Sequence, residues 1–257
     1  MFTNNFDPVA FQIFSIEIRW YSLAYILGIL LGWAYCKRNI IKDKTLFNLF
    51  DDFITYLIFG IILGGRLGYC LIYNLNYYLE NPIEIFMIWN GGMSFHGGLV
   101  GVFIAALFFS KKYQLNHFIF LDLVSISAPI GIFFGRIANF INSELYGRPT
   151  ELPWSVKFVL IDNVKRHPSQ LYEAFFEGII LFIILRYLTK KNYLKNPGLI
   201  SGSFLIFYSL FRFMTEFFRS PDLQIGYVAL NLTLGQFLSI FFLILGGVLF
   251  YYKKNED

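Results

Sequence analysis

The stretch GRIANFINSELYG at residues 135–147 carries an arginine, two asparagines and a glutamate directly after the apolar run SAPIGIFF. Polar or small residues recur in it at helical spacing, so one face of a helix would carry Arg136, Asn139, Ser143 and Gly147. The neighbouring glycine and alanine keep this face small, which lets another backbone or a lipid headgroup approach. Packing against another helix is the simpler alternative for the same stretch.

A second polar stripe lies in FYSLFRFMTEFFRSPD, at the end of another apolar run. Intervals of four, four and three residues place on one helix face Tyr208, Arg212, Glu216 and Arg219. Two arginines on different helices at similar depth suit a phosphate, because each guanidinium offers parallel donors in one plane. The second stripe could instead be an Arg–Glu ladder that only packs helices.

The composition is that of a membrane protein. Of 257 residues, 56% are apolar and 15% are charged, whereas a soluble domain carries about a quarter charged residues. Several apolar runs are long enough to cross the hydrocarbon layer as helices. We therefore predict an all-α polytopic protein, a single integral membrane domain over residues 1–257. Its seven expected transmembrane helices are 18–36, 50–74, 93–110, 118–141, 170–189, 199–218 and 233–252.

The connectors between these helices differ in basic content. Most of the basic residues follow the first, third, fifth and seventh helices: Lys37, Arg38, Lys42, Lys44, Lys111, Lys112, Arg186, Lys190, Lys191, Lys195, Lys253 and Lys254. The opposite connectors hold fewer, namely Arg148, Lys157, Lys165, Arg166 and Arg219. Because basic residues favour the cytoplasm, we predict an outer N-terminus and a cytoplasmic C-terminus. No removable signal peptide is expected.

Two connectors on the predicted outer side are long. Residues 75–92 contain no lysine or arginine and are predicted to form a partly amphipathic segment at the membrane interface. Residues 142–169 contain three prolines around WSVKFVLID, which is predicted to be a strand in a small extramembrane insert. Connectors of this length without helical pattern are usually functional or disordered.

Other polar residues could also take part in chemistry. For Arg66, which lies among glycines, we favour a structural ion pair, with Asp122 as a candidate partner, over a substrate contact. His96 opens the third predicted helix and could be either a base or a satisfied hydrogen-bonding residue. His167 precedes a proline and is expected to fix a turn, while His117 is given no role.

The remaining composition argues against other kinds of site. Cys36 and Cys70 lack the spacing of a metal or redox pair, and we interpret them as small apolar residues. No cluster of metal ligands is visible in the sequence, so no metal or other cofactor is expected. The net charge of +4 is small, and no nucleic-acid partner is expected.

The stretch GRIANFINSELYGR resembles the signature of the bacterial prolipoprotein diacylglyceryl transferases, G-R-x-G/A-N-F-x-N-x-E-x-x-G. Six further segments resemble the same family in the same order: IRWYSLAY, GGRLGY, WNGGMSFHGGLVG, RHPSQLYEA, YSLFRFMTEFFRSPD and LTLGQFLS. Together they span almost the whole chain, and the predicted insert is less similar than the rest.

The resemblance implies a seven-helix enzyme of the bacterial plasma (inner) membrane, with its site open to the outer leaflet. The implied reaction transfers diacylglyceryl from phosphatidylglycerol to the lipobox cysteine thiol of a secreted prolipoprotein, giving a thioether and glycerol phosphate. The functional residues that it implies are Tyr21, His96, Arg136, Asn139, Glu144, Gly147, Tyr208, Arg212, Glu216 and Arg219.

The chemistry of these residues suits a reaction in which a thiolate attacks a glyceryl carbon and a phosphate monoester leaves. Cationic donors stabilise the growing phosphate charge, so Arg136 and Arg212 are predicted to be catalytic, oriented by Glu216 and Glu144. A thiol with a pKa of about 8.5 needs a base or a positive potential, and His96 is the first candidate. The other implied residues are predicted to bind substrate.

Other classes of protein fit less well. A transporter for an anionic amphiphile could use the same arginines, but it needs access from the inner side, where the sequence shows lysine-rich connectors. A membrane scaffold leaves the clustered polar groups without a purpose. The chain lacks the Gly-x-Ser-Gly nucleophile of a rhomboid-type protease and the aspartate run of a CDP-alcohol phosphotransferase.

Overall fold

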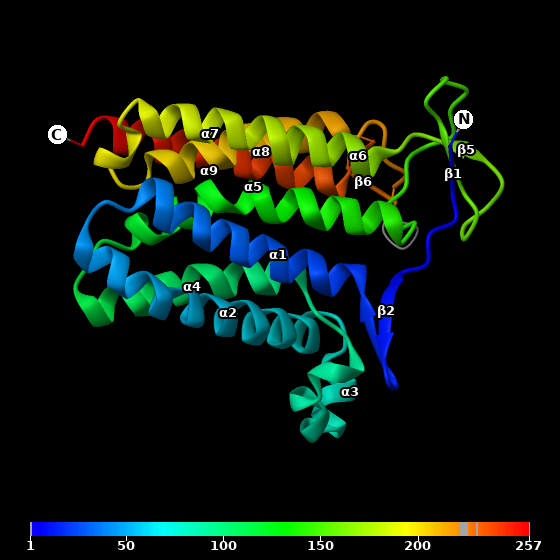
Figure 1. Cartoon of the computed structure of the whole chain (residues 1–257), viewed down its shortest axis with the longest axis horizontal. Helices are drawn as coiled ribbons and strands as arrows, with labels where there is room; N and C mark the ends of the chain where they lie inside the picture. The colour runs from blue at the N-terminus through cyan, green and yellow to red at the C-terminus, as the bar shows by residue number, and fades with distance from the viewer. Residues whose placement is uncertain (1, 222–225, 230, 257) are drawn as a thin grey trace. The chain divides into compact units, whose positions relative to one another are not determined.

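The computed structural model describes residues 2–221, 226–229 and 231–256 (Figure 1). Contacts between residues divide the chain into two compact units. The first unit comprises residues 1–36 and 122–257, and the second comprises residues 37–121.

The first unit holds most of the elements. Its helices are α1 (Trp20–Tyr35), most of α5 (His117–Ile141), α6 (Ser169–Glu173), a π-helical stretch (Ala174–Ile180), α7 (Leu181–Lys190), α8 (Leu199–Thr215) and α9 (Leu234–Lys254). A short 3-10 turn (Tyr193–Lys195) precedes α8. Its strands are β1 (Phe2–Asn4), β2 (Val9–Ile13), β3 (Ile16–Arg19), β4 (Val156–Phe158), β5 (Lys165–Arg166), β6 (Tyr227–Ala229) and β7 (Leu232–Thr233).

The second unit begins within a π-helical turn (Cys36–Ile40). It contains α2 (Lys44–Ile72), α3 (Leu75–Glu80), two 3-10 turns (Pro82–Phe86 and Ile88–Asn90) and α4 (Phe95–Tyr113). The side chain of Asp43 accepts a hydrogen bond from the Leu46 N–H, which caps α2, and Ser94 caps α4 in the same way through the Gly97 N–H.

Helices lie in each range that was predicted to cross the membrane. Among the described residues, four have both the length and the hydropathy of a span, namely α2, α4, α5 and α9. The remaining ranges hold shorter or interrupted helices: α1 has 16 residues, α8 has 17, and a π-helical stretch separates α6 from α7. The chain is thus mainly helical, with several helices able to cross a membrane, and the number of seven spans stays a prediction.

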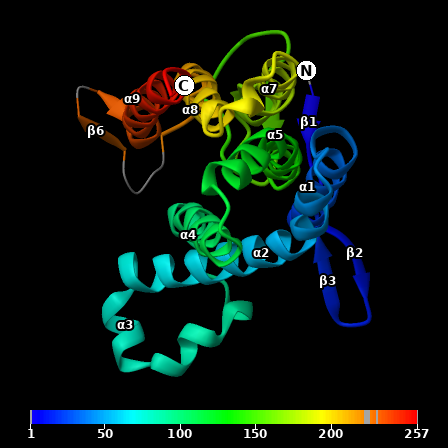
Figure 2. The ribbon, with the colours of Figure 1, turned by 90° about the vertical axis from the view of Figure 1, so that its left-hand side faces the viewer.

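The helices of the first unit lie side by side in the order α9, α8, α7, α5 and α1 (Figure 2). Glycines bring some of them very close together. A β-carbon on Gly28 of α1 would lie 2.8 Å from the Gly131 α-carbon of α5, and one on Gly246 of α9 would lie 2.7 Å from the Leu205 β-carbon of α8. These contacts pack α1 against α5 and α9 against α8, and α5 and α8 carry the two polar stripes.

Asp122 is buried on α5 and caps the beginning of α8. Its carboxylate accepts hydrogen bonds of 2.8 Å from the N–H groups of Gly198 and Ser201, and another from the Ser201 hydroxyl. A carboxylate at a helix N-terminus satisfies N–H groups that have no partner within the helix. These contacts contradict the predicted ion pair between Asp122 and Arg66.

In the second unit, α2 and α4 cross at their glycines. A β-carbon on Gly64 would lie 2.8 Å from the Gly101 α-carbon, and one on Gly68 would lie 2.7 Å from the Gly97 α-carbon. The four-residue spacing of the glycines on α2, from Gly60 onward, places them along one face, as close helix packing requires.

Arg66 is buried beside this contact and binds the backbone of the segment between α2 and α4. Its guanidinium donates to the carbonyl oxygens of Glu84, Ile85, Met87, Gly91 and Gly92. The structural role favoured for Arg66 agrees with these contacts, but its partners are carbonyl groups rather than Asp122. The segment 75–92, predicted as partly amphipathic, consists of α3 and two 3-10 turns held by this arginine.

The predicted insert at 142–169 contains the predicted strand. β4 pairs in parallel with β1 from the N-terminus and antiparallel with β5. No sequence pattern predicted β1 to β3, so the all-α prediction omits short strands that satisfy backbone groups outside the helices. Arg166 Nη2 lies 2.6 Å from Asp162 Oδ2, and this guanidinium holds the pKa of Asp162 below its usual range.

His167 fixes the turn that leads into α6, as predicted. Its N–H donates to the Arg148 carbonyl over 3.0 Å, and its own carbonyl accepts from the Gly147 N–H over 3.1 Å. Ring Nδ1 lies 3.2 Å from the Tyr172 hydroxyl. Burial lowers the pKa of His167, in keeping with a neutral packed ring.

Candidate functional site

The signature stretch leaves α5 and runs antiparallel to the segment that follows α8. Gly147 and Arg219 form a β-bridge, and the Arg148 N–H donates to the Phe218 carbonyl over 2.9 Å. A β-carbon on Gly147 would lie 2.8 Å from the Phe218 carbonyl oxygen, so a residue without a side chain is needed here. The pairing joins the ends of the two helices that carry the polar stripes.

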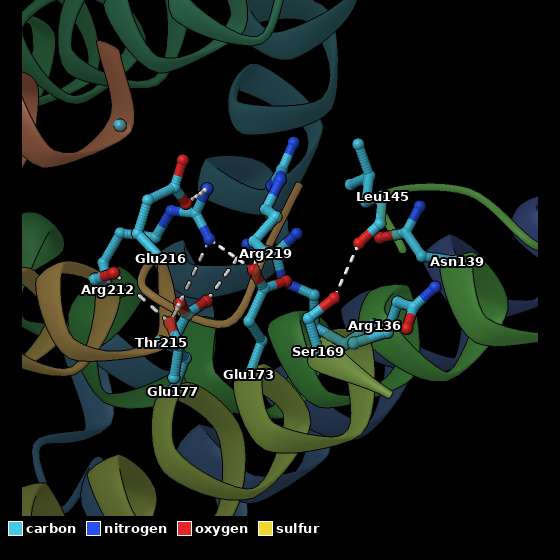
Figure 3. A network of polar contacts seen from close by, with 12 residues as sticks. Arg136, Asn139, Leu145, Ser169, Glu173, Glu177, Arg212, Thr215, Glu216 and Arg219 are labelled. Atoms are coloured by element: carbon cyan, nitrogen blue, oxygen red, sulfur yellow. Dashed lines mark hydrogen bonds and ion pairs between the residues drawn. The ribbon is translucent and has the colours of Figure 1, made fainter. Parts of the chain in front are cut away.

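Arginines of both stripes meet the same pair of carboxylates (Figure 3). Arg136 Nε lies 3.0 Å from Glu173 Oε2, and its Nη2 lies 3.0 Å from Glu177 Oε2. Arg212 Nη1 pairs with Glu173 Oε1 and lies 3.8 Å from Glu177 Oε1. Arg219 Nη1 lies 3.7 Å from Glu173 Oε1. Glu173 and Glu177 thus hold together the arginines of α5 and α8; the five residues are called the arginine cluster below.

The two carboxylates of the arginine cluster are buried more deeply than its three arginine side chains. The side chains of Glu173 and Glu177 have no exposed surface. Arg136, Arg212 and Arg219 keep 15%, 12% and 8% of their side-chain surface exposed. The small exposed surface of the cluster therefore belongs to the arginine side chains.

Glu216 binds the same cluster from the end of α8. Its Oε2 lies 2.5 Å from Arg212 Nη2, and its Oε1 accepts a hydrogen bond of 2.9 Å from the Thr233 hydroxyl. With this carboxylate, three acidic side chains face three guanidiniums, which offsets the cost of burying charge. The contact agrees with the predicted orientation of Arg212 by Glu216.

A second network surrounds Asn139, which is buried one turn after Arg136 on α5. Asn139 Nδ2 donates to Glu144 Oε2 over 3.1 Å and lies 3.5 Å from the Tyr21 hydroxyl. Ser143 has a positive φ of 58°, which turns the chain back so that the Glu144 carboxylate faces Asn139. The Glu144 carboxylate thus accepts from an amide, and its predicted role in orienting the arginines stays a prediction.

Tyr208 lies one turn before Arg212 on α8. Its ring stacks on Phe204 with centroids 5.5 Å apart and planes 8° apart. The side chain is half-buried, beside the residues of the arginine cluster on the same helix. Tyr208 thus lies on the same helix as Arg212, as the predicted stripe requires.

His96 belongs to the second unit, whereas the arginine cluster belongs to the first. It is exposed at the second residue of α4, and its ring contacts Phe95 edge-on with centroids 5.6 Å apart. His96 also lines an apolar groove of about 960 Å³ along α2 and α4. The structure therefore leaves both predicted readings of His96, base or hydrogen-bonding residue, as predictions.

Glu173 and Glu177 are functional candidates that the prediction from sequence missed. They lie four residues apart in LYEAFFEGII, within the predicted helix 170–189. Two acidic residues inside an apolar helix are costly unless they are paired, and this is a signal that could have identified them. The described residues contain no group of three or more histidine, cysteine, aspartate or glutamate side chains placed to hold a metal ion.

Comparison with known proteins identifies one family. The family model for prolipoprotein diacylglyceryl transferase matches residues 8–252. The phosphatidylglycerol–prolipoprotein diacylglyceryl transferase of Rickettsia akari (strain Hartford) is 53% identical over 248 residues, which cover 95% of this chain and 96% of the relative. The same enzyme of Rickettsia felis (strain ATCC VR-1525 / URRWXCal2) is 53% identical over 249 residues, with the same coverage.

The burial of the arginine cluster makes a prediction about stability. Glu173→Gln removes a buried charge and leaves guanidiniums without compensation, so we expect it to lower the free energy of unfolding by about 3–5 kcal/mol. Glu151→Gln is the control, because Glu151 pairs with Lys165 at 2.7 Å but is 85% exposed, and it should cost about 1 kcal/mol or less. Thermal unfolding in detergent compares the two. Equal melting temperatures would contradict the structural role of Glu173.

Proposed function

The chain belongs to the prolipoprotein diacylglyceryl transferase family, and we propose that it transfers diacylglyceryl from phosphatidylglycerol to the lipobox cysteine of prolipoproteins. This reaction is the first step of bacterial lipoprotein maturation. The relatives are named as transferases, which favours an enzyme over the alternative of a transporter for an anionic amphiphile. The arginine cluster is the structural observation that supports the proposal most directly.

In the proposed reaction, the cysteine thiolate of the prolipoprotein attacks the glyceryl carbon that bears the phosphate. A carbon–sulfur bond forms while the carbon–oxygen bond to phosphate breaks, and the electron pair leaves with the phosphate oxygen. The products are a thioether-linked prolipoprotein and glycerol phosphate. Negative charge therefore grows on the phosphate as the bond breaks, and fixed donors aimed at it stabilise the transition state more than the ground state.

We assign the leaving phosphate to Arg136 and Arg212. Their guanidiniums come from different helices, share Glu173, and keep part of their surface exposed. Because the buried carboxylates hold these guanidiniums in place, little reorganisation is needed when charge develops nearby. An arginine is suited to this task by its planar array of donors.

The remaining candidate residues are assigned to substrate binding. Asn139, Tyr21 and Glu144 form one hydrogen-bonded group that suits the hydroxyl groups of the glycerol headgroup. The others are Gly147, Tyr208, Glu216 and Arg219, which lie on or beside the arginine cluster. No cofactor enters this scheme.

We propose that the protein is a single integral domain of the bacterial plasma membrane with its site facing the outer leaflet. The asymmetry of basic residues supports an outer N-terminus, an outer insert at 142–169 and a cytoplasmic C-terminus. Single cysteines are introduced into a protein from which Cys36 and Cys70 have been removed. Cysteines in 142–169 should then react with an impermeant maleimide in intact cells. Cysteines in 37–48 should not react, and their labelling from outside would reverse the orientation.

Transfer of labelled diacylglyceryl from phosphatidylglycerol to a lipobox peptide tests the function and the arginine assignment together. The purified protein should catalyse transfer, and Arg136→Gln or Arg212→Gln should each lower turnover by about 10²–10³. Lysine at either position should recover only part, because it keeps the charge but loses the planar fork.

The control for this experiment is Arg186→Gln, which changes an exposed arginine on α7 and should leave turnover unchanged. Turnover is compared per folded enzyme in detergent micelles. An inactive wild-type protein would contradict the proposed function. Folded glutamine variants that keep more than about a tenth of the turnover would contradict only the arginine assignment.

His96 is assigned as the base that removes the thiol proton, on its position at the glycine-flanked start of α4. His96→Gln should then lower turnover strongly while phosphatidylglycerol binding changes little. Raising the pH should restore part of the lost rate, because more thiolate forms without a base as the pH approaches the thiol pKa of about 8.5. A pH–rate profile measures both effects. Near-normal turnover of the variant at neutral pH would leave His96 with a hydrogen-bonding role.

A further inference from the structure

The segment LTLGQFLS, which begins α9, has so far been given no part in the reaction. Its first helical residues lie against Glu216, the carboxylate that pairs with Arg212. Thr233 is the N-cap of α9, and its side chain is 3% exposed. The start of α9 therefore contacts the arginine cluster through one acidic side chain.

Gly235 lacks a side chain and so leaves room for the Glu216 carboxylate. A β-carbon on Gly235 would lie 2.8 Å from Glu216 Oε1, 3.0 Å from Cδ and 3.2 Å from Oε2. These three atoms are its nearest neighbours, so the whole carboxyl group packs against the bare α-carbon. A side chain at position 235 would meet the carboxyl end of Glu216 first, and it would displace the carboxylate.

Thr233 sets the direction of the same carboxylate. Its hydroxyl donates to Glu216 Oε1 over 2.9 Å and accepts from the Gln236 N–H over 3.3 Å. The Gln236 side chain in turn accepts from the Thr233 N–H over 3.1 Å, which completes a capping box. Because the hydroxyl proton points at Glu216 while its lone pair serves the helix, the cap fixes the position of this donor.

The beginning of α9 also favours a carboxylate electrostatically. The N-terminus of a helix carries a partial positive charge, and a negative side chain beside it is stabilised. Glu216 therefore lies between two positive groups, the Arg212 guanidinium on one side and the first turn of α9 on the other. Glu216 meets Nη2 of Arg212, whereas Glu173 and Glu177 meet Nη1.

We propose that Thr233 and Gly235 are positioning residues that set the Arg212 guanidinium by fixing the Glu216 carboxylate. Neither residue is assigned a contact with substrate. The inference rests on the proposed function, because it uses the role of Arg212 at the leaving phosphate. If the Arg212 guanidinium is displaced, the rate of the chemical step should fall more than the affinity for lipid. The reason is that this guanidinium acts on charge that develops in the transition state.

Gly235→Ala tests the space for the carboxylate, with Gly247→Ala as the control on the same helix. A β-carbon on Gly247 would meet no atom within 4 Å, and alanine favours helices over glycine at both positions. Gly247→Ala should transfer diacylglyceryl at the wild-type rate. Gly235→Ala should lower kcat by about tenfold to a hundredfold, the scale expected for a misplaced catalytic group. The KM for phosphatidylglycerol should stay near the wild-type value.

Thr233→Ser and Thr233→Asp test the hydrogen bond separately from the helix cap. Serine and aspartate both cap helices well, but only serine can donate a proton to Glu216. We expect Thr233→Ser to keep kcat near the wild-type value and Thr233→Asp, which sets a second carboxylate against Glu216, to lower kcat per folded enzyme by about tenfold or more. This pair remains informative if Gly235→Ala fails to fold.

The outcomes separate the inference from the function on which it rests. A wild-type protein without transfer activity would remove the proposed function and the inference with it. Active wild-type protein whose folded Gly235→Ala variant matches Gly247→Ala, or whose Thr233→Asp variant matches Thr233→Ser, would overturn the inference alone. A rise in KM at unchanged kcat would also overturn it, because binding common to the ground state and the transition state would then have been lost.

Discussion

The ion pairs of Glu173 and Glu177 with arginines of α5 and α8 are the contacts on which the candidate site depends. Charged groups at this depth are costly unless they are paired. Each carboxylate meets Arg136 from one helix and Arg212 from the other, so neither helix can shift without separating charges. The two acidic side chains lie on α6 and the π-helical stretch that follows it, and such stretches often occur at functional sites.

The burial pattern bears on the proposed role of the arginine cluster at a phosphate. The side chains of Glu173 and Glu177 have no exposed surface, while the arginine side chains keep a small exposed part. Donors that are held by buried partners are already oriented when a phosphate arrives, so their effect on developing charge is not lost to reorganisation. Lysine would carry the same charge but not the planar fork that lets Arg136 bind Glu173 and Glu177 with two different nitrogens.

The sequence was sufficient to predict what depends on local spacing. The apolar runs located the helices, the segment WSVKFVLID was predicted to be a strand and contains β4, and helical periodicity placed Arg136 and Arg212 on polar stripes. Pairing between distant segments was not predictable in this way. Arg66 binds backbone carbonyl groups, and Glu144 binds the side-chain amide of Asn139. These partners depend on how the connecting segments fold, and spacing along the chain does not predict them.

Glu173 and Glu177 show why only part of the site could be predicted from the sequence. The stripes on α5 and α8 were identified by residues that repeat along one helix, whereas these carboxylates belong to a third helix, about forty residues from each stripe. Their buried charge could have been noticed, but its partners follow only from the packing of α6 against α8. The backbone adds a second constraint, because the Gly147–Arg219 bridge ties the end of α5 to the residues that follow α8. Each stripe is thus fixed twice, by its carboxylates within the helices and by paired backbone beyond them, and the arginines keep their orientation because both constraints meet at the same end.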